Sequence, residues 1–279
     1  MKYNKDMSSI HAYLCGDGYV IKNPPEQKHK YYYIGLRNYN ITLLKDFQSK
    51  CKRQFFIKPR IKKDGRAIIQ NKNLYYELTN DTSFYSREWK IPVLNKTNLS
   101  AWLRSFFDCE AWVEVEKGKS RAIRLDSVNK GGVIQIQNAL NNFKINSTLK
   151  NRKNGQIRLN LCGLDDLKKF QKHINFFHPE KNKLLQEAIE SYVNYEWEVP
   201  KTRGRLIKFI NKTGKIRKPY QVRLFTIKKK NLVNLKKALK RYRIRSKIHG
   251  PYRNQHGSLN YYLSLPYVNY KKLGGNKWK

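Results

Sequence analysis

Two segments that repeat one pattern constrain the fold of this chain more than any other feature. Each is an apolar run with helical spacing in which two small residues stand four positions apart, Ala12 and Gly16 in the first and Ser105 and Cys109 in the second. Small residues at positions i and i+4 leave a flat strip on one face of a helix, so two such helices can pack with their backbones close together. The duplication therefore predicts two helices that cross at a shared interface.

An acidic residue follows each strip, Asp17 in the first segment and Glu110 in the second. Packing of the two helices would place these carboxylates side by side at one end of the crossing. Two carboxylates forced together are a candidate site for a divalent metal ion. The alternative is that Asp17 belongs to an ordinary Asp-Gly turn and that Glu110 is a helix-end carboxylate paired with one of many basic residues.

The charge of the chain points to a polyanionic partner. Its 59 Lys and Arg residues against 20 Asp and Glu give a formal net charge of +39, far more than solubility requires. Nucleic acid is the first candidate, and a membrane is disfavoured because no apolar run approaches the length of a membrane span. No Cys-x-x-Cys pair, Gly-rich phosphate loop or catalytic Ser, His and Asp arrangement competes as an active site.

The N-terminal residues lack the apolar stretch of a secretory signal, and Asp6 argues against a transit peptide. The sequence therefore predicts a cytoplasmic protein, or one of an organelle interior if the gene is organellar.

The predicted elements follow one order twice: helix, two strands, helix, two strands. Strand patterns, β-turn residues and a capping Asn40 define the first set, and the second set follows Glu110. The expected strands of the first set cover residues 18–22, 30–37, 55–62 and 66–71. The second set has strands at 112–116, 121–126, 148–151 and 156–161, with helices at 132–143 and 164–174.

A third, incomplete copy follows. Arg223-Leu224 repeats Arg124-Leu125, and further residues match at the same spacing, which makes chance similarity improbable. The segment before this copy has no small-residue strip that ends in an acid. We therefore expect three domains, comprising two repeats at 1–95 and 96–195 and an accessory nucleic-acid-binding unit without catalytic capacity at 196–279.

Alternation along the strands predicts one apolar face and one polar face for each sheet. In the second repeat, Ile157 and Leu159 oppose Arg158 and Asn160. Arg, Gln, Asn and Asp are side chains that read base edges in the major groove, while basic turn tips contact phosphates. Simple solvation of the polar faces is the alternative. The predicted DNA-binding residues are Tyr33, Arg37, Lys62, Lys63, Arg66, Arg124, Asp126, Lys150, Arg152, Lys153, Gln156, Arg158, Asn160, Gln221, Arg223, Lys247 and Arg253.

The acid-bearing segments resemble the LAGLIDADG motif of homing endonucleases. The last acid and glycine of the motif match Asp17 and Gly18 in the first copy, whereas Ala111 follows Glu110 in the second. The phrase Phe176-Phe-His-Pro also resembles the end of the family's second repeat. The resemblance implies an α+β fold of pseudo-symmetric tandem αββαββα repeats with curved antiparallel DNA-binding sheets, plus a C-terminal partial repeat lacking the acid helix.

The resemblance also implies an activity. It predicts an intron-encoded, monomeric endonuclease that cuts both strands of a long pseudo-palindromic DNA site, leaves 3′ overhangs and uses Mg²⁺ or Mn²⁺. Asp17 and Glu110 would hold the metal and act in catalysis. The family pattern places two polar and two basic residues near this pair, which gives the further catalytic candidates Asn38, Ser127, Lys117 and Lys119; each could instead be a turn, cap or hairpin residue.

Other functions remain open from the sequence alone. A chain of this kind could be an RNA-binding maturase that assists splicing of its own intron, with intron RNA as a partner. It could also be a DNA-binding protein, such as a regulator, that uses the same scaffold without cleavage. A basic ribosome-associated protein would share the charge but has no need for a duplicated acid at a helix crossing.

Overall fold

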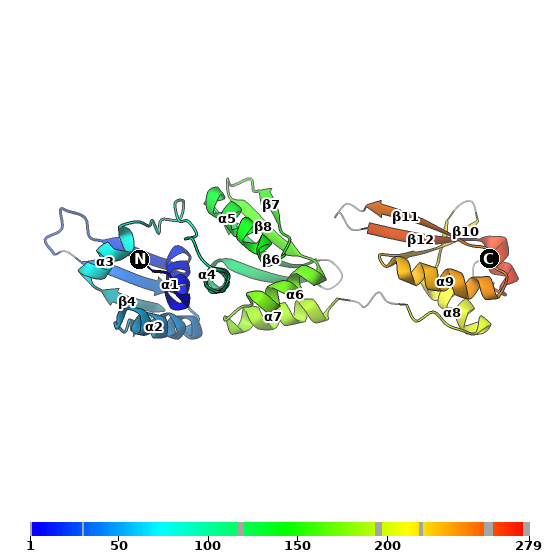
Figure 1. The fold of residues 1–279 in the computed structure, drawn as a ribbon, viewed down its shortest axis with the longest axis horizontal. Helices are drawn as coiled ribbons and strands as arrows, with labels where there is room; N and C mark the ends of the chain where they lie inside the picture. Colours follow the sequence, from blue (N-terminus) through cyan, green and yellow to red (C-terminus); the bar gives the residue numbers. More distant parts are fainter. Residues whose placement is uncertain are drawn as a thin grey trace. The chain divides into compact units, whose positions relative to one another are not determined.

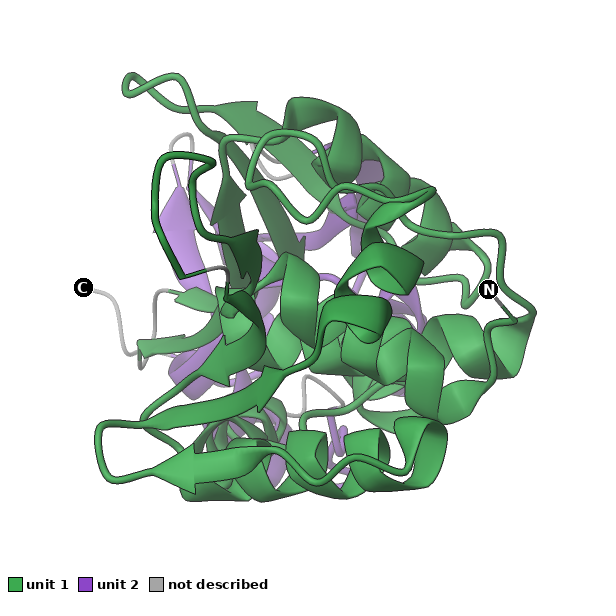
Figure 2. Ribbon diagram, turned by 90° about the vertical axis from the view of Figure 1, so that its left-hand side faces the viewer, with its two compact units in different colours: residues 1–192 green, residues 193–279 purple. Residues whose placement is uncertain are grey.

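The computed structural model describes residues 2–29, 31–116, 120–192, 197–217, 220–253 and 259–275. The chain forms two compact units, residues 1–192 and residues 193–279, which Figure 2 draws in green and purple. Each unit has its own hydrophobic core, and each is described separately below.

The first repeat begins with α1 (Lys5–Cys15), whose N-terminus is capped by Asn4 through a bond from the Met7 amide. The predicted cap Asn40 begins α2 in the same way and accepts a hydrogen bond from the amide of Thr42. The remaining elements are β1 (Gly18–Lys22), β2 (Tyr32–Arg37), α2 (Ile41–Phe55), β3 (Arg60–Lys62), β4 (Arg66–Gln70) and α3 (Lys72–Thr79).

The second repeat begins with α4, whose cap Asn95 accepts a hydrogen bond from the amide of Asn98. The helices α5 (Lys130–Asn141), α6 (Leu164–His173) and α7 (Pro179–Glu190) pack on the sheet of this repeat, and α6 and α7 end it (Figure 1). Its elements are α4 (Lys96–Glu110), β5 (Ala111–Glu116), β6 (Ser120–Ser127), α5 (Lys130–Asn141), β7 (Thr148–Asn151), β8 (Ile157–Cys162), α6 (Leu164–His173) and α7 (Pro179–Glu190).

The second unit repeats the same order of elements. They are α8 (Arg203–Thr213), β9 (Lys215–Arg217), β10 (Gln221–Thr226), α9 (Lys229–Arg241), β11 (Lys247–Arg253), β12 (Leu259–Pro266) and α10 (Tyr267–Lys272). Apolar residues of α8 and α9, such as Leu206 and Leu235, pack with the inward residues Leu224 and Leu263 of the sheet.

All three sheets are four-stranded and antiparallel, and they share one topology. The strand orders are β1-β2-β4-β3, β5-β6-β8-β7 and β9-β10-β12-β11, so the second and fourth strands of each repeat lie at the centre. This arrangement confirms the predicted fold class of tandem αββαββα repeats with antiparallel sheets.

Some elements differ from the sequence prediction. Helix α2 continues to Phe55, where a strand was expected to start. The αββαββα pattern implies the closing helix α3, for which no bounds were predicted, and α7 is an additional helix. The C-terminal copy is also more complete than expected, because α8 occupies the place of the missing helix. The acid is absent, because Thr213 ends α8 where Glu110 ends α4, and Lys208 and Lys212 stand where α4 carries the small residues Ser105 and Cys109.

No helix within the described ranges combines the length and the apolar character needed to cross a membrane.

Candidate active site and nucleic-acid-facing sheets

Helices α1 and α4 pack directly against each other, as the small-residue strips predict. A Cβ atom added to Gly16 would lie 2.7 Å from the Cβ of Cys109, closer than such atoms approach in folded proteins. Ala12 and Ser105 are buried. The two helices therefore meet through small side chains, and any larger residue at position 16 would force them apart.

Asp17 follows the last turn of α1, and the predicted residue Asn38 holds its carboxylate. The Asn38 side-chain amide donates a 2.7 Å hydrogen bond to Asp17 Oδ2. Asn38 is fixed in turn, because its carbonyl Oδ1 accepts from the Asn40 amide and its backbone amide donates to the Gly65 carbonyl. The turn between β3 and β4, where Gly65 has a positive φ, thus contributes to the position of Asp17.

Glu110 is the last residue of α4. Burial, together with the negative charge of Asp17, raises the pKa of its carboxyl to about 7, while the positive charge of Lys181 acts in the opposite direction. Asp17 and Glu110 thus lie close enough to affect each other's charge. A cation beside this pair would relieve both the burial cost and the repulsion.

Lys181, near the start of α7, is a residue of this site that the sequence prediction missed. Its Nζ donates to the backbone carbonyls of Asp108 at 2.6 Å and Cys109 at 3.3 Å, at the C-terminal end of α4. Burial lowers the pKa of Lys181, whereas nearby groups including Asp17 and Glu110 raise it. The available signal in the sequence was its position three residues after His178, in the segment that resembles the end of the family's second repeat.

The segment 176–179, which leads into α7, anchors that helix to α4. The carboxylate of Asp108, which is almost fully buried, accepts hydrogen bonds from the amides of Phe177 and His178 at 2.9–3.2 Å. Burial raises the pKa of Asp108 to about 7, and these two amides oppose the shift. The His178 ring also contacts the side-chain amide of Asn40 at 3.2 Å, which joins the two repeats.

The other predicted catalytic residues lie differently. Ser127 occupies the place in the second repeat that Asn38 occupies in the first, and its hydroxyl accepts from the Asn129 amide at 3.1 Å. Among the described contacts of Ser127, none joins it to Glu110. Lys117 and Lys119 lie outside the described residues.

The sheet faces alternate as predicted. Ile157, Leu159 and Leu161 are buried in the core, while Arg158 and Asn160 lie on the opposite face. On this outer face Arg158 forms a paired hydrogen bond with Asp126 at 2.5–2.6 Å, and Arg124 forms an ion pair with Glu114 at 2.5 Å. The arginines predicted to read bases are therefore held in place by carboxylates.

The predicted basic contacts lie mostly at the turn tips and strand ends. Lys62, Lys63, Lys150, Arg152 and Lys153 are exposed at two such turns. Arg66 is held by Asp64 at the tip between β3 and β4. The remaining predicted residues lie on outer strand positions or at turns, and comprise Tyr33 and Arg37 on β2, Gln156 before β8, Gln221 and Arg223 on β10, and Lys247 and Arg253 on β11.

Within the described part of the chain, no group of three or more His, Cys, Asp or Glu side chains is arranged to hold a metal ion. The candidate ligands at the helix crossing are the two carboxylates alone.

Two αββαββα repeats whose first helices cross beside a pair of acids define a pseudo-symmetric α+β protein. The comparison with protein families agrees: residues 97–175 match the family described as "LAGLIDADG-like domain". Residues 97–175 are thus similar to a LAGLIDADG-like domain, in agreement with the motifs of the sequence. No curated protein matches the chain in sequence.

The solved structures that the chain matches include homing endonucleases. Mesophilic variants of the homing endonuclease I-DmoI are 22% identical with a TM-score of 0.49, covering 66% of this chain and 100% of theirs. I-DmoI in complex with DNA and Mn is 23% identical with a TM-score of 0.46, covering 60% and 96%. The homing endonuclease I-WcaI bound to its DNA recognition sequence is 17% identical with a TM-score of 0.42, covering 66% and 88%. Full-length DUF199/WhiA from Thermatoga maritima is 11% identical with a TM-score of 0.46, covering 76% and 68%.

Proposed function

We propose that this protein is a site-specific endonuclease that cuts both strands of duplex DNA. The observation that carries the proposal is the convergence of Asp17 and Glu110 from equivalent helices, with the pKa of Glu110 raised to about 7 by burial and by the neighbouring acid. A purely structural helix crossing has no reason to bring two acids together, because their repulsion destabilises it.

The two acids fit a divalent metal ion. Mg²⁺ is commonly held by one or two carboxylates together with water and the phosphates of a substrate, and Asp17 and Glu110 supply that number of oxygen ligands. When bound there, Mg²⁺ or Mn²⁺ would activate water and stabilise the charge that develops on the scissile phosphate.

The surrounding residues have positioning roles in this proposal. Asn38 fixes the orientation of the Asp17 carboxylate through its 2.7 Å hydrogen bond. Lys181 ties α7 to the end of α4 and lowers the cost of charge on Glu110. Ser127, Lys117 and Lys119 remain candidates for the corresponding roles at the second acid.

The outer faces of the first two sheets are suited to the duplex. Their basic turn tips can contact phosphates, and ion-paired Arg158 and Arg124 present fixed donors toward base edges. Two acids related by pseudo-symmetry, one for each strand, account for double-strand cleavage by a monomer at a long pseudo-palindromic site. We further propose that the protein is intron-encoded, leaves 3′ overhangs, and acts in the cytoplasm or in an organelle interior.

The test is a cleavage selection on a library of random duplexes, with Mg²⁺ in one arm and Ca²⁺ in the other. We expect sequencing to recover one family of staggered ends with Mg²⁺ only. Asp17→Asn and Glu110→Gln should abolish these ends while duplex binding survives, and Glu187→Gln, at an exposed acid of α7, is the matched control. Equal cutting by wild type and both site variants would refute the proposal.

A further inference from the structure

A row of three aromatic rings crosses the outer face of the sheet in the second unit. Phe225 of β10 stands directly opposite Tyr262 of β12, and Tyr262 stands opposite His249 of β11. These side chains point away from the core, because their neighbours Leu224 and Leu263 are fully buried on the other face. Helices cover only that inner face, so the row faces outward.

The rings are arranged as a stacking surface around Tyr262. The His249 ring is nearly parallel to it at 4.5 Å between centroids, and the Tyr252 ring is nearly parallel at 5.7 Å. The Arg223 guanidinium lies over the same ring at 4.9 Å. Burial, together with the positive charges of Lys247 and Arg223, lowers the pKa of His249, which favours the neutral form of its ring.

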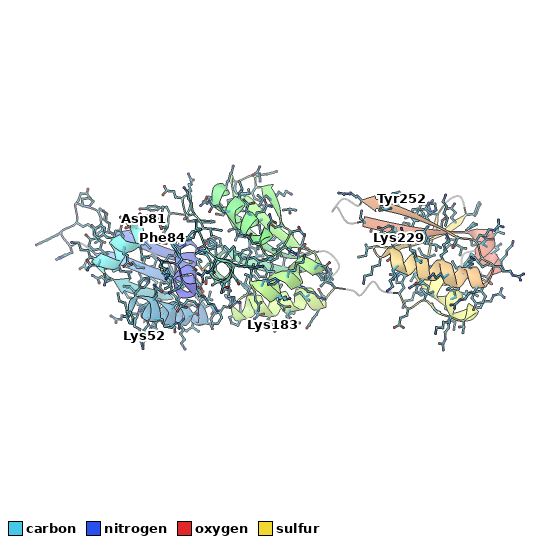
Figure 3. All side chains as sticks on the ribbon, in the orientation of Figure 1. Lys52, Asp81, Phe84, Lys183, Lys229 and Tyr252 are labelled. Atoms are coloured by element: carbon cyan, nitrogen blue, oxygen red, sulfur yellow. The ribbon has the colours of Figure 1, made fainter. Side chains whose placement is uncertain are left out.

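The surface is open to solvent. Phe225 is 45% exposed and Tyr252, labelled in Figure 3, is 50% exposed. Together with Asn260, Tyr261 and Tyr262 they line an open hollow of about 520 Å³. Exposed aromatic side chains gathered in one place are uncommon on a soluble protein without a binding role.

The same row is charged in the other two repeats. In the second repeat the aligned positions, set by strand register, hold Asp126, Arg158 and Lys150. In the first repeat they hold three cations instead, Arg37, Arg66 and Lys62. The scaffold is unchanged, and the row is charged in the first two copies but aromatic in the third.

The charge of the second unit favours a polyanion as the occupant. Residues 193–279 contain 24 Lys and Arg against two acids, both Glu. A neutral or basic protein surface would not attract so positive a unit. A phosphate backbone would, because the unit can neutralise its many negative charges.

We propose that the sheet of the second unit binds an unpaired strand of nucleic acid, with bases stacked on Phe225, Tyr252 and Tyr262. Base faces are accessible only in an unpaired strand, because a duplex already stacks them internally. Exposed aromatic rings on a basic antiparallel sheet recognise such strands by stacking and by cation–π contact from arginine. This binding does not depend on the proposed cleavage and would survive its failure.

The test measures fluorescence anisotropy of labelled 12-nucleotide single strands, RNA and DNA in separate arms, with the full-length protein. Excess unlabelled duplex DNA is present to occupy the duplex-binding sheets of the first unit. Tyr262→Leu and Phe225→Leu should each weaken single-strand binding roughly tenfold, whereas Tyr262→Phe should stay within about twofold of wild type. Tyr220→Leu, at a strongly exposed tyrosine outside the row, is the matched control.

Circular dichroism melts establish that each variant is folded. Binding of either RNA or DNA that falls with the leucine variants supports the proposal, and the better ligand identifies the source of the strand. Single-strand binding that is unchanged in Tyr262→Leu and Phe225→Leu would overturn it. So would full displacement of the labelled strand by duplex, because the same sheet would then bind paired DNA.

Discussion

The two units of this chain build the same sheet and differ in the residues on its outer face. Residues 1–192 carry 35 Lys and Arg against 18 acids, their outer strand positions hold ion-paired arginines, and the acids Asp17 and Glu110 are half-buried at the helix crossing. Residues 193–279 lack nearly all acids, carry Thr213 where the acid stands, and replace a charged row with aromatic rings. Strand order is therefore the same in all three copies, whereas the outer face and the residue that ends the first helix differ, and the proposed functions rest on those differences.

The largest expected difference between the units concerns their first helices. Gly16→Val should destabilise the first unit by about 3 kcal/mol and abolish cleavage, because its Cβ would overlap Cys109. Gly204→Val in α8 should change stability by less than about 0.5 kcal/mol, since nothing lies within 4 Å of its Cβ position. Hydrogen exchange read by mass spectrometry reports each unit separately, and equal effects of the two variants would break the comparison.

The next largest effect should come from Lys181. Lys181→Met removes a charged donor from two carbonyls and a cation from beside Glu110, which should lower the cleavage rate roughly a hundredfold. Lys183→Met is the matched control, because Lys183 lies exposed on the same helix (Figure 3). A cleavage rate for Lys181→Met equal to that of the control would remove Lys181 from the site.

A smaller effect on stability, which depends on pH, is expected from the buried His11 of the first unit. Burial lowers the pKa of His11 to about 3, and its Nδ1 accepts a 3.0 Å hydrogen bond from the Trp102 indole. The folded state therefore excludes a proton that the unfolded chain binds near pH 6.5, so this contribution to stability is present above pH 6.5 and is lost as pH falls toward 3. At pH 5 the loss is about 2 kcal/mol.

Denaturation from pH 7 to pH 5 measures this contribution as the difference between wild type and His11→Gln, which keeps an acceptor for Trp102. The comparison with a variant is necessary because burial raises the pKa of Asp108 and Glu110, and both groups stabilise the fold as pH falls. An identical pH profile for wild type and His11→Gln would contradict the assignment of a neutral buried imidazole.

The smallest expected effect is on single-strand affinity, when residues on the outer face of the third sheet are exchanged for those of the second. The double substitution Phe225→Asp and Tyr262→Arg places the ion pair of Asp126 and Arg158 in the third sheet, in the same register. The unit should stay folded and lose single-strand affinity roughly tenfold, with a steeper dependence on salt. Affinity that does not change would show that charge alone, and not stacking, distinguishes the two units.

The sequence predicts much of this structure because the signals are local and repeated. Alternation placed Ile157 and Leu159 inward, Asn40 capped α2, and the small-residue strips marked the helix crossing. It did not predict that α8 completes the third repeat, because a helix without an acid lacks the motif. Thr213 ends α8 at the position where an acidic residue would have made the motif recognisable.

Parts of the site depended on contacts distant in sequence. Lys181 reaches the end of α4 from α7, more than 70 residues later, and its place shortly after His178 does not by itself show that it contacts α4. The aromatic row was missed for a related reason. Phe225, Tyr262 and His249 are neighbours only through strand register, which alternation along a single strand does not reveal.

The central claim is that catalysis belongs to the paired acids of the first two repeats and that the third repeat has none. The most direct measurement is the single-turnover rate of double-strand cleavage in Mg²⁺ for wild type, Glu110→Gln and Thr213→Ala, the last two being changes at equivalent helix ends. We expect a loss of at least about a thousandfold for Glu110→Gln and a wild-type rate for Thr213→Ala. A Glu110→Gln protein that cuts both strands at the rate of wild type would contradict the central claim.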